Sequence, residues 1–431
     1  MSTKLSSLQP PPAQSTPPLM PPPNAMMSNE SQSADNLMAT VIIDNKKANI
    51  ADKTIEYSNS DENVLLVRNN GNLTIDNSKL IKTGDSSNNE DSNFTGLNAI
   101  LLANNSHVSI SNSTLDSSAE GSNGIFATGK KSLITVSNVI INTEKGSSRG
   151  LDATYGGNII ADNVKITTKG AHCAALATDR GEGNVSVTQG TLSTSGEGSP
   201  CIYSTGNIKA TNSTGIATGS EIAVVEGKNS ITLENVDLTG YVQHGIMLYQ
   251  SFSGDANTGT ASFSVKNSKL HNNSQGAMFY ITNTKAIANL ENTLLDSKSN
   301  ILINVTSDRW GNSGQNGGDF TFNAKNQLLK GNVLANSLSR ITINLKNKTI
   351  WQGAFNPDNT ADKAAITLDF SSQWELTGNS YITSFTDNDL SFNNIKSHGY
   401  NVYYNLDSCK NLAGKTYLLN GGGKLAPIQS N

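Results

Sequence analysis

Six titratable residues near the middle of the chain have the types needed for acid–base chemistry or for holding a divalent cation. They are Arg149, Asp152, His172, Asp179, Arg180 and Glu182. Carboxylates that share a site can ligate Ca²⁺ or divide the roles of general acid and general base. Because Asp152 aligns with Leu176 one repeat later, we expect these side chains to form one patch. The catalytic candidates in it are Asp152, Asp179, Arg180 and Glu182. The alternative is a solvated face with scattered charges.

Other features that could carry chemistry are few. The turn GDSSNNEDSN (84–93) contains carboxylates that could hold a divalent ion weakly, or it forms a long exposed loop. The three cysteines, Cys173, Cys201 and Cys409, are not in a metal-ligand spacing. Cys173 and Cys201 stand about one repeat apart, so they form either a disulfide between neighbouring repeats or two buried thiols. We predict no metal site and no cofactor.

Composition narrows the classes of function. Charged residues make up 15% of the 431 residues, against about 25% in an ordinary soluble domain, and the formal net charge is −4. Without a basic excess, nucleic acid is not an expected partner. No apolar run approaches the roughly 18–20 residues of a membrane-spanning helix. The first 23 residues hold eight of the eleven prolines, so residues 1–38 are predicted to be an extended linker or tail, without a visible cleavable leader.

From about residue 40 the sequence is a repeat. Segments such as LTIDNSKL (73–80), ITVSNVII (134–141) and ITLENVDL (231–238) alternate apolar and polar residues and then place an Asn. Alternation of this kind is typical of strands. The Asn column holds Asn77, Asn112, Asn138, Asn163, Asn212, Asn235, Asn267, Asn292, Asn326 and Asn347, and Gln189 is its one break.

The spacing of this column predicts a β-solenoid. Most gaps between successive members are 23 to 26 residues, which is too short for a unit to close its own core. Each unit must therefore stack on its neighbours. We expect the Asn side chains to form a ladder of hydrogen bonds in a buried bend. The residue three positions later, such as Leu238 or Leu270, is assigned to the interior.

A second strand motif recurs with the same spacing, for example in NGIFAT (123–128) and HGIMLY (244–249). By alignment, one column of this motif contains Phe126, Asp152, Leu176, Tyr203 and Met247. Tyr203, together with Tyr249 of the same strand motif, could stack on sugar rings if the column faces outward. Alternatively, alternate members of the motif point inward and fill the core.

A periodic Asn at a turn between strands resembles the parallel β-helix proteins, a group that includes pectate lyases, phage tailspikes and bacterial surface passenger domains. The stretch WQGAFN (351–356) and the Trp-bearing ITLDFSSQWELTGNSYITSF (366–385) are similar to the distal part of autotransporter passengers. The resemblance implies a right-handed, single-stranded parallel β-helix. We expect about twelve coils over residues 39–431, with 351–431 as distal coils and C-terminal cap.

The passenger resemblance and the missing catalytic motifs imply a non-catalytic, adhesin-like protein, secreted or displayed on the cell surface, that binds a glycan or a neighbouring surface. The alternative is a lyase or glycoside hydrolase acting on an acidic polysaccharide through the patch around residues 149–182. However, the chain lacks the paired aspartates and the Arg-x-Lys that polygalacturonases carry. The expected ligand is therefore a glycan or a cell-surface molecule.

Overall fold

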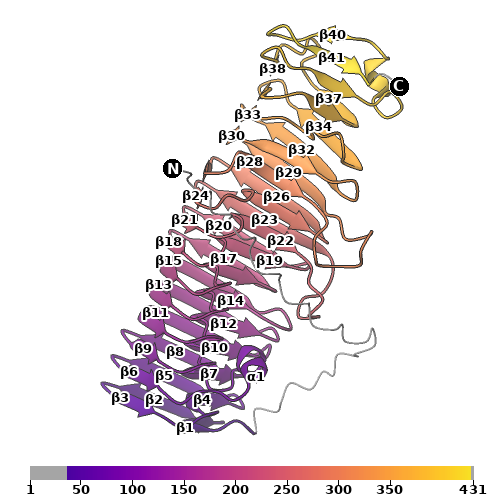
Figure 1. The fold of residues 1–431 in the computed structure, drawn as a ribbon. Helices are drawn as coiled ribbons and strands as arrows, with labels where there is room; N and C mark the ends of the chain where they lie inside the picture. The colour runs from indigo at the N-terminus through magenta and orange to yellow at the C-terminus, as the bar shows by residue number, and fades with distance from the viewer. Residues whose placement is uncertain (1–35, 429–431) are drawn as a thin grey trace, which may run out of the picture. The chain divides into compact units, whose positions relative to one another are not determined.

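A computed structural model describes residues 36–428, which form an all-β parallel β-solenoid of stacked turns (Figure 1). The predicted fold class is confirmed. The predicted number of coils is wrong, because the chain makes about sixteen turns instead of twelve. The Asn column does not mark the first turn (39–57) or the turns beyond residue 350, so counting Asn residues misses them. Of the predicted tail, residues 1–38, all but 36–38 lie outside the described part of the chain.

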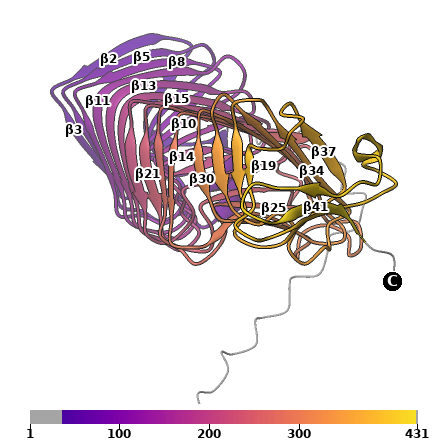
Figure 2. The same ribbon diagram turned by 90° about the horizontal axis from the view of Figure 1, so that it is seen from above.

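Sheet A takes one short strand from each of twelve turns, all paired in parallel. Seen from above, successive turns lie one behind another, and strands such as β2 (Lys47–Ala51), β5 (Asn72–Asp76) and β8 (His107–Ser111) follow each other along one side of the wall (Figure 2). In spatial order the strands of sheet A are β1 (Ala39–Asp44), β4 (Asn63–Arg68), β7 (Leu101–Asn104), β10 (Ile125–Thr128), β12 (Leu151–Thr154), β14 (Leu176–Thr178), β16 (Ile202–Ser204), β19 (Ala223–Glu226), β22 (Ile246–Tyr249), β25 (Phe279–Thr282), β28 (Ile301–Val305) and β31 (Asn332–Ala335).

Sheet B forms most of the rest of the wall and bends at the Asn column. In β11 (Leu133–Thr143), β13 (Asn158–Thr168) and β15 (Asn184–Thr194) one strand runs through the bend. In other turns the bend separates two strands, as in the pairs β2 (Lys47–Ala51) and β3 (Thr54–Tyr57), β5 (Asn72–Asp76) and β6 (Lys79–Lys82), β8 (His107–Ser111) and β9 (Thr114–Ser117), β17 (Asn207–Thr211) and β18 (Thr214–Ala217), β20 (Ser230–Glu234) and β21 (Asp237–Gly240), β23 (Thr260–Lys266) and β24 (Lys269–Asn272), and β26 (Lys285–Glu291) and β27 (Leu294–Ser297). The sheet continues through β29 (Asp319–Lys325), β32 (Arg340–Lys346), β34 (Lys363–Leu368) and β37 (Ser384–Asp387).

The distal turns are shorter and more aromatic. Sheet C contains β30 (Leu328–Lys330), β33 (Ile350–Gln352), β35 (Gln373–Glu375) and β38 (Ile395–Lys396), and sheet D contains β36 (Ser380–Ile382), β39 (Val402–Tyr404), β40 (Tyr417–Leu418) and β41 (Lys424–Pro427). Trp351 and Trp374 are neighbours in sheet C, with ring planes 3° apart and centroids 5.3 Å apart. Both indoles are fully buried, and each donates its Nε1–H to a backbone carbonyl. The antiparallel pairing of β40 with β41 ends the described solenoid.

Aliphatic columns from all turns fill the interior. Every second residue of a typical strand is buried, as the alternation of sheet geometry requires. Leu238 and Leu270 are neighbours in adjacent turns and are completely buried, which confirms their assignment to the core. Phe263, Phe279 and Phe320 lie in this same core, in a chain of ring contacts.

The Asn column lies at the surface, so the prediction of a buried ladder is wrong. All ten asparagines are exposed, with φ between 44° and 56°. Asn tolerates this left-handed conformation better than most residues do, and the conformation turns its side chain outward. Five neighbouring pairs have Nδ2 and Oδ1 2.8–3.5 Å apart. The side chain that enters the wall at the bend is the next one, such as Ser113 or Val164, and both are buried.

The three cysteines are free and buried. In the backbone register Cys173 lies beside Ser199 and not beside Cys201, because Leu176 pairs with Ile202 three residues further on. The Cys173 Sγ accepts the Ser148 N–H at 3.0 Å, and the Cys173 N–H donates to Ser199 Oγ at 2.9 Å. Cys173 therefore occupies one place in a buried column of serine hydroxyls. Of the two alternatives, the structure has buried thiols.

Candidate functional site

The outward face of sheet A carries most of the residues singled out from the sequence, and three loops cover it. We call it the covered face. The first loop (84–98) includes the short helix α1 (Asn89–Phe94), and the others span 250–259 and 306–318. Phe126 lies in a buried cluster separate from the interior core. The Trp310 ring packs on Tyr249 with centroids 5.4 Å apart. The loops thus exclude solvent from much of this face.

The register of the covered face corrects the sequence alignment by one residue. Phe126 pairs with Asp152, Asp152 with Ala177, and Ala177 with Tyr203. The prediction that Leu176 shares this column is wrong. Leu176 takes the interior position of Leu151, and burial of that apolar residue fixes the register.

Arg149, Asp152 and Asp179 form a buried ion cluster beneath the loops. Arg149 Nη2 lies 2.8 Å from Asp179 Oδ2, without the alignment of a hydrogen bond, and Arg149 Nε lies 3.7 Å from Asp152 Oδ2. Asp152 is completely buried, and neither of its carboxylate oxygens has a hydrogen-bond partner. Burial raises the pKa of Asp152 well above its usual value and that of Asp179 to about 6. Two of the three predicted carboxylates are therefore brought together, with one arginine between them.

Glu226 occupies the centre of a second network on the same face. Its Oε2 accepts hydrogen bonds from the hydroxyls of Tyr203 at 2.5 Å and Tyr249 at 2.9 Å, and its Oε1 accepts from Ser251. Tyr249 is 9% exposed and Tyr203 is half-buried. The two tyrosines lie in neighbouring columns of sheet A, two residues apart along the strand direction, and both face outward from the sheet, as one of the two sequence alternatives had it. Both phenols are engaged by Glu226, so they do not form an open aromatic stripe.

Arg180 and Glu182 lie at the rim and hold the loops. Arg180 Nη2 is 2.7 Å from Asp255 Oδ1 and 3.6 Å from Glu90 Oε1, and its guanidinium lies over the Phe94 ring. Glu182 accepts a hydrogen bond from Asn257 and pairs with Lys228 at 2.9 Å. The sequence grouped these two with the buried aspartates, but the structure separates them. His172 is exposed in a turn and is not part of the ion cluster.

Nothing in the covered face adds a metal site. The acidic turn at 84–93 forms the start of α1, where the Asn88 side chain caps the helix by accepting from the backbone of Glu90 and Asp91. Asp85 pairs with Lys145 at 2.8 Å. No group of three His, Cys, Asp or Glu side chains within residues 36–428 could hold a metal ion. The covered face therefore contains two shielded carboxylates beside Arg149 and a third, Glu226, bound to tyrosine hydroxyls.

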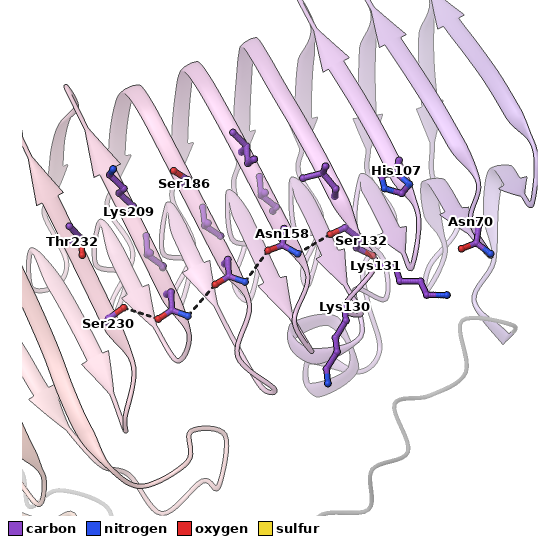
Figure 3. Close-up of a pocket in the computed structure, with 17 residues that line it drawn as sticks. Asn70, His107, Lys130, Lys131, Ser132, Asn158, Ser186, Lys209, Ser230 and Thr232 are labelled. Carbon is purple, nitrogen blue, oxygen red and sulfur yellow. Dashed lines mark hydrogen bonds between the residues drawn. The ribbon is translucent and has the colours of Figure 1, made fainter.

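The outward face of sheet B is different, because it holds an open groove of about 830 Å³. The groove crosses β8, β11, β13, β15, β17 and β20 (Figure 3). Its polar lining residues are Asn70, His107, Lys130, Lys131, Ser132, Asn158, Asn184, Ser186, Asn207, Lys209, Ser230 and Thr232, and Ile160 is an exposed apolar residue in its floor. We call this region the open groove.

A row of amides runs along the open groove. Asn184 donates from Nδ2 to Asn158 Oδ1 at 2.9 Å, and Asn207 donates to Asn184 at 3.1 Å. At the ends, Asn158 donates to the backbone carbonyl of Ser132, and Ser230 donates to Asn207 (Figure 3). The row fixes the orientation of the Asn158, Asn184 and Asn207 amides.

The charge of the open groove differs from that of a second depression further along sheet B. Three lysines and one histidine line the groove, and no acidic residue is among its lining residues. The distal depression, of about 550 Å³, includes Lys266 and Lys325. Both approach the same Oε1 of Glu291, at 3.9 and 3.1 Å. The distal depression also contains Lys346 and Glu234, so the open groove carries the larger excess of positive charge.

Sequence reasoning missed the open groove, although a signal for it exists. Asn158, Asn184 and Asn207 each lie five residues before a member of the Asn column, in Asn163, Gln189 and Asn212. A second polar column at constant offset marks an outward position on the same strand. Lys130 and Lys131, in contrast, belong to a turn, and the alignment of strands does not place them.

Comparisons with known proteins identify no relative, because no family model, curated protein or solved structure matches this chain. None of the helices within residues 36–428 is long and apolar enough to cross a membrane.

Proposed function

We propose that this protein is a non-catalytic, adhesin-like protein, secreted or displayed on a cell surface, that binds a glycan through the open groove. The observation that carries the proposal is the groove itself. It is accessible, it spans several turns, and it presents oriented amides and unburied lysines. An extended polymer with repeated hydroxyl or acidic groups has the chemistry to occupy such a surface.

The test is attachment of the purified protein to an array of immobilised glycans and to intact cells. Ser186→Leu places a bulky, uncharged side chain in the middle of the groove and should weaken binding without changing the thermal midpoint. Thr191→Leu is the matched control, since Thr191 lies on the same strand β15 beyond the bend and is exposed. Equal binding by wild type and Ser186→Leu would refute a role for the groove.

The second candidate function is cleavage of an acidic polysaccharide, and the juxtaposition of Asp152 and Asp179 with Arg149 favours it. Two carboxylates with raised pKa values and a cation are suited to acid–base work on such a substrate. The difficulty is access, because Asp152 and Asp179 are 0% and 3% exposed. Release of unsaturated or reducing ends from pectins, alginate or glycosaminoglycans by wild type, but not by Asp179→Asn, would favour the enzyme over the adhesin.

A further inference from the structure

We propose that the ligand of the open groove is a linear anionic polysaccharide, carboxylated or sulfated, lying along the solenoid axis across successive strands. This inference rests on the proposed function and specifies its ligand.

The first support is charge. Lys130 and Lys131 stand in the turn beside the groove, and Lys209 stands on β17. None of these three lysines forms an ion pair with another described residue. The chain as a whole has a net charge of −4, so the groove is a positive region on an acidic protein. Such a region attracts a polyanion and repels other acidic surfaces.

The nearest acidic residues on these strands lie outside the groove lining. Asp162 is two positions beyond Ile160 on β13, and Glu234 is two positions beyond Thr232 on β20. Alternate residues of a strand face the same side, so these carboxylates form the far border of the groove. An anionic chain is therefore confined between them and the lysine turn.

The second support is the hydrogen-bonding capacity of the amide row. Each Asn amide nitrogen carries two hydrogens, and Asn184 and Asn207 each donate one along the row. The other hydrogen is available to an acceptor in the groove. Since these donors recur once per turn, about every 4.8 Å, they suit a ligand whose acceptor groups also recur.

The third support is the extent and floor of the groove. The six strands that the groove crosses are neighbours in sheet B, so they span five inter-strand steps, or roughly 24 Å. This length exceeds the size of a single anion or monosaccharide. Ile160 is 53% exposed in the middle of this path. Its side chain offers a small apolar surface against which the C–H face of a sugar ring can pack. The groove thus combines features of a site for an oligosaccharide.

The experiment measures binding of the full chain to polygalacturonate, heparin and neutral dextran at low and physiological salt. Wild type should bind polygalacturonate or heparin and not dextran, and its affinity should fall as salt rises. Lys130→Gln/Lys131→Gln/Lys209→Gln should bind about tenfold more weakly or worse, because three charged contacts are lost. The control Lys266→Gln/Lys325→Gln/Lys346→Gln removes the same charge from the distal depression and should bind as wild type does.

The outcomes separate this inference from the proposed function. Binding of either polyanion, lost only in the groove variant, supports the inference, and the stronger of the two identifies the acidic group. Equal loss in both triple variants, or equal binding of double-stranded DNA, would mean unspecific attraction of polyanions and would overturn it. Binding of dextran alone, weakened by Ser186→Leu, would also overturn it but leave the adhesin proposal intact.

Discussion

The covered face of sheet A and the open groove of sheet B are formed by the same stack of turns, but their polar groups lie in opposite surroundings. On the covered face, three loops enclose Arg149, Asp152 and Asp179, and one carboxylate has no hydrogen-bond partner. In the open groove, amides bond to one another in the presence of water and lysines remain unpaired.

In this solenoid, enclosed charges and exposed charges are expected to serve different purposes. Enclosed charges interact strongly because little solvent screens them, and removing one leaves the other uncompensated. Exposed charges contribute little to folding and are free to meet a ligand. We therefore expect substitutions in the covered face to change stability, and equivalent substitutions in the open groove to change binding.

The largest effect is expected from Arg149→Met. It leaves Asp152 and Asp179 buried without their cation, so the free energy of unfolding at pH 7 should fall by about 3–5 kcal/mol. Urea unfolding measures it. The matched change in the open groove, Lys209→Met, should stay within about 0.5 kcal/mol of wild type. A similar decrease in the free energy of unfolding in both variants would show that the two faces do not differ in their contribution to stability.

The second effect concerns pH. Burial raises the pKa of Asp179 from its usual 3.8 to about 6, so between these values the folded state binds more protons than the unfolded state. Stability should therefore fall as pH rises from about 4 to about 6, by up to about 3 kcal/mol for this group. Asp179→Asn should flatten this part of the stability profile. An unchanged profile would show that Asp179 titrates normally.

The third effect tests the bend that lies between the two halves of sheet B. Asn163 has φ of 50°, so Asn163→Ala should cost about 1–2 kcal/mol through the left-handed backbone. Asn163→Gly accepts this conformation and should cost less in thermal unfolding. If Gly is as damaging as Ala, the 2.8 Å amide contact with Asn138 contributes more than the backbone does, contrary to the conformational explanation.

The smallest effect is expected from Cys173→Ser. The position already belongs to a column of serines, so the hydroxyl finds the same partners and the loss should be under about 1 kcal/mol. Cys201→Ser is the informative comparison, because Cys201 packs in the apolar core and should lose more. Mass spectrometry without reductant should detect no Cys173–Cys201 peptide. A disulfide-linked peptide would contradict the register.

The sequence predicts the fold because alternation and period both survive in each turn. It places Leu238 and Leu270 in the core correctly, because a column of large apolar residues that recurs in every turn is stable only when it is buried in the interior. It errs on the Asn column because alternation does not reveal that a left-handed residue reverses the direction of its side chain. Turns that lack an Asn at the bend are also missed when the turns are counted from the spacing of the Asn column.

The candidate sites were predictable only in part. Asp152 and Asp179 lie together because strand stacking is regular, even though the alignment at Leu176 was one residue out. Arg180 and Glu182 could not be separated from them, because their partners Asp255 and Asn257 are 75 residues away along the chain. Lys130 and Lys131 depend on the path of a turn, which no periodic pattern encodes.

The three loops over the covered face also influence which strands pair during folding. Turns of nearly equal length and similar strand pattern offer a folding chain several almost equivalent neighbours, so a strand can mispair by one turn. Each long loop occurs once, and its contacts are specific. A slip of one turn between Arg180 and β22 would separate Arg180 from Asp255 and Glu182 from Asn257, pairs that otherwise bridge three turns of the stack. These two contacts can form only in the native pairing of the turns, so they stabilise that pairing over arrangements shifted by one turn.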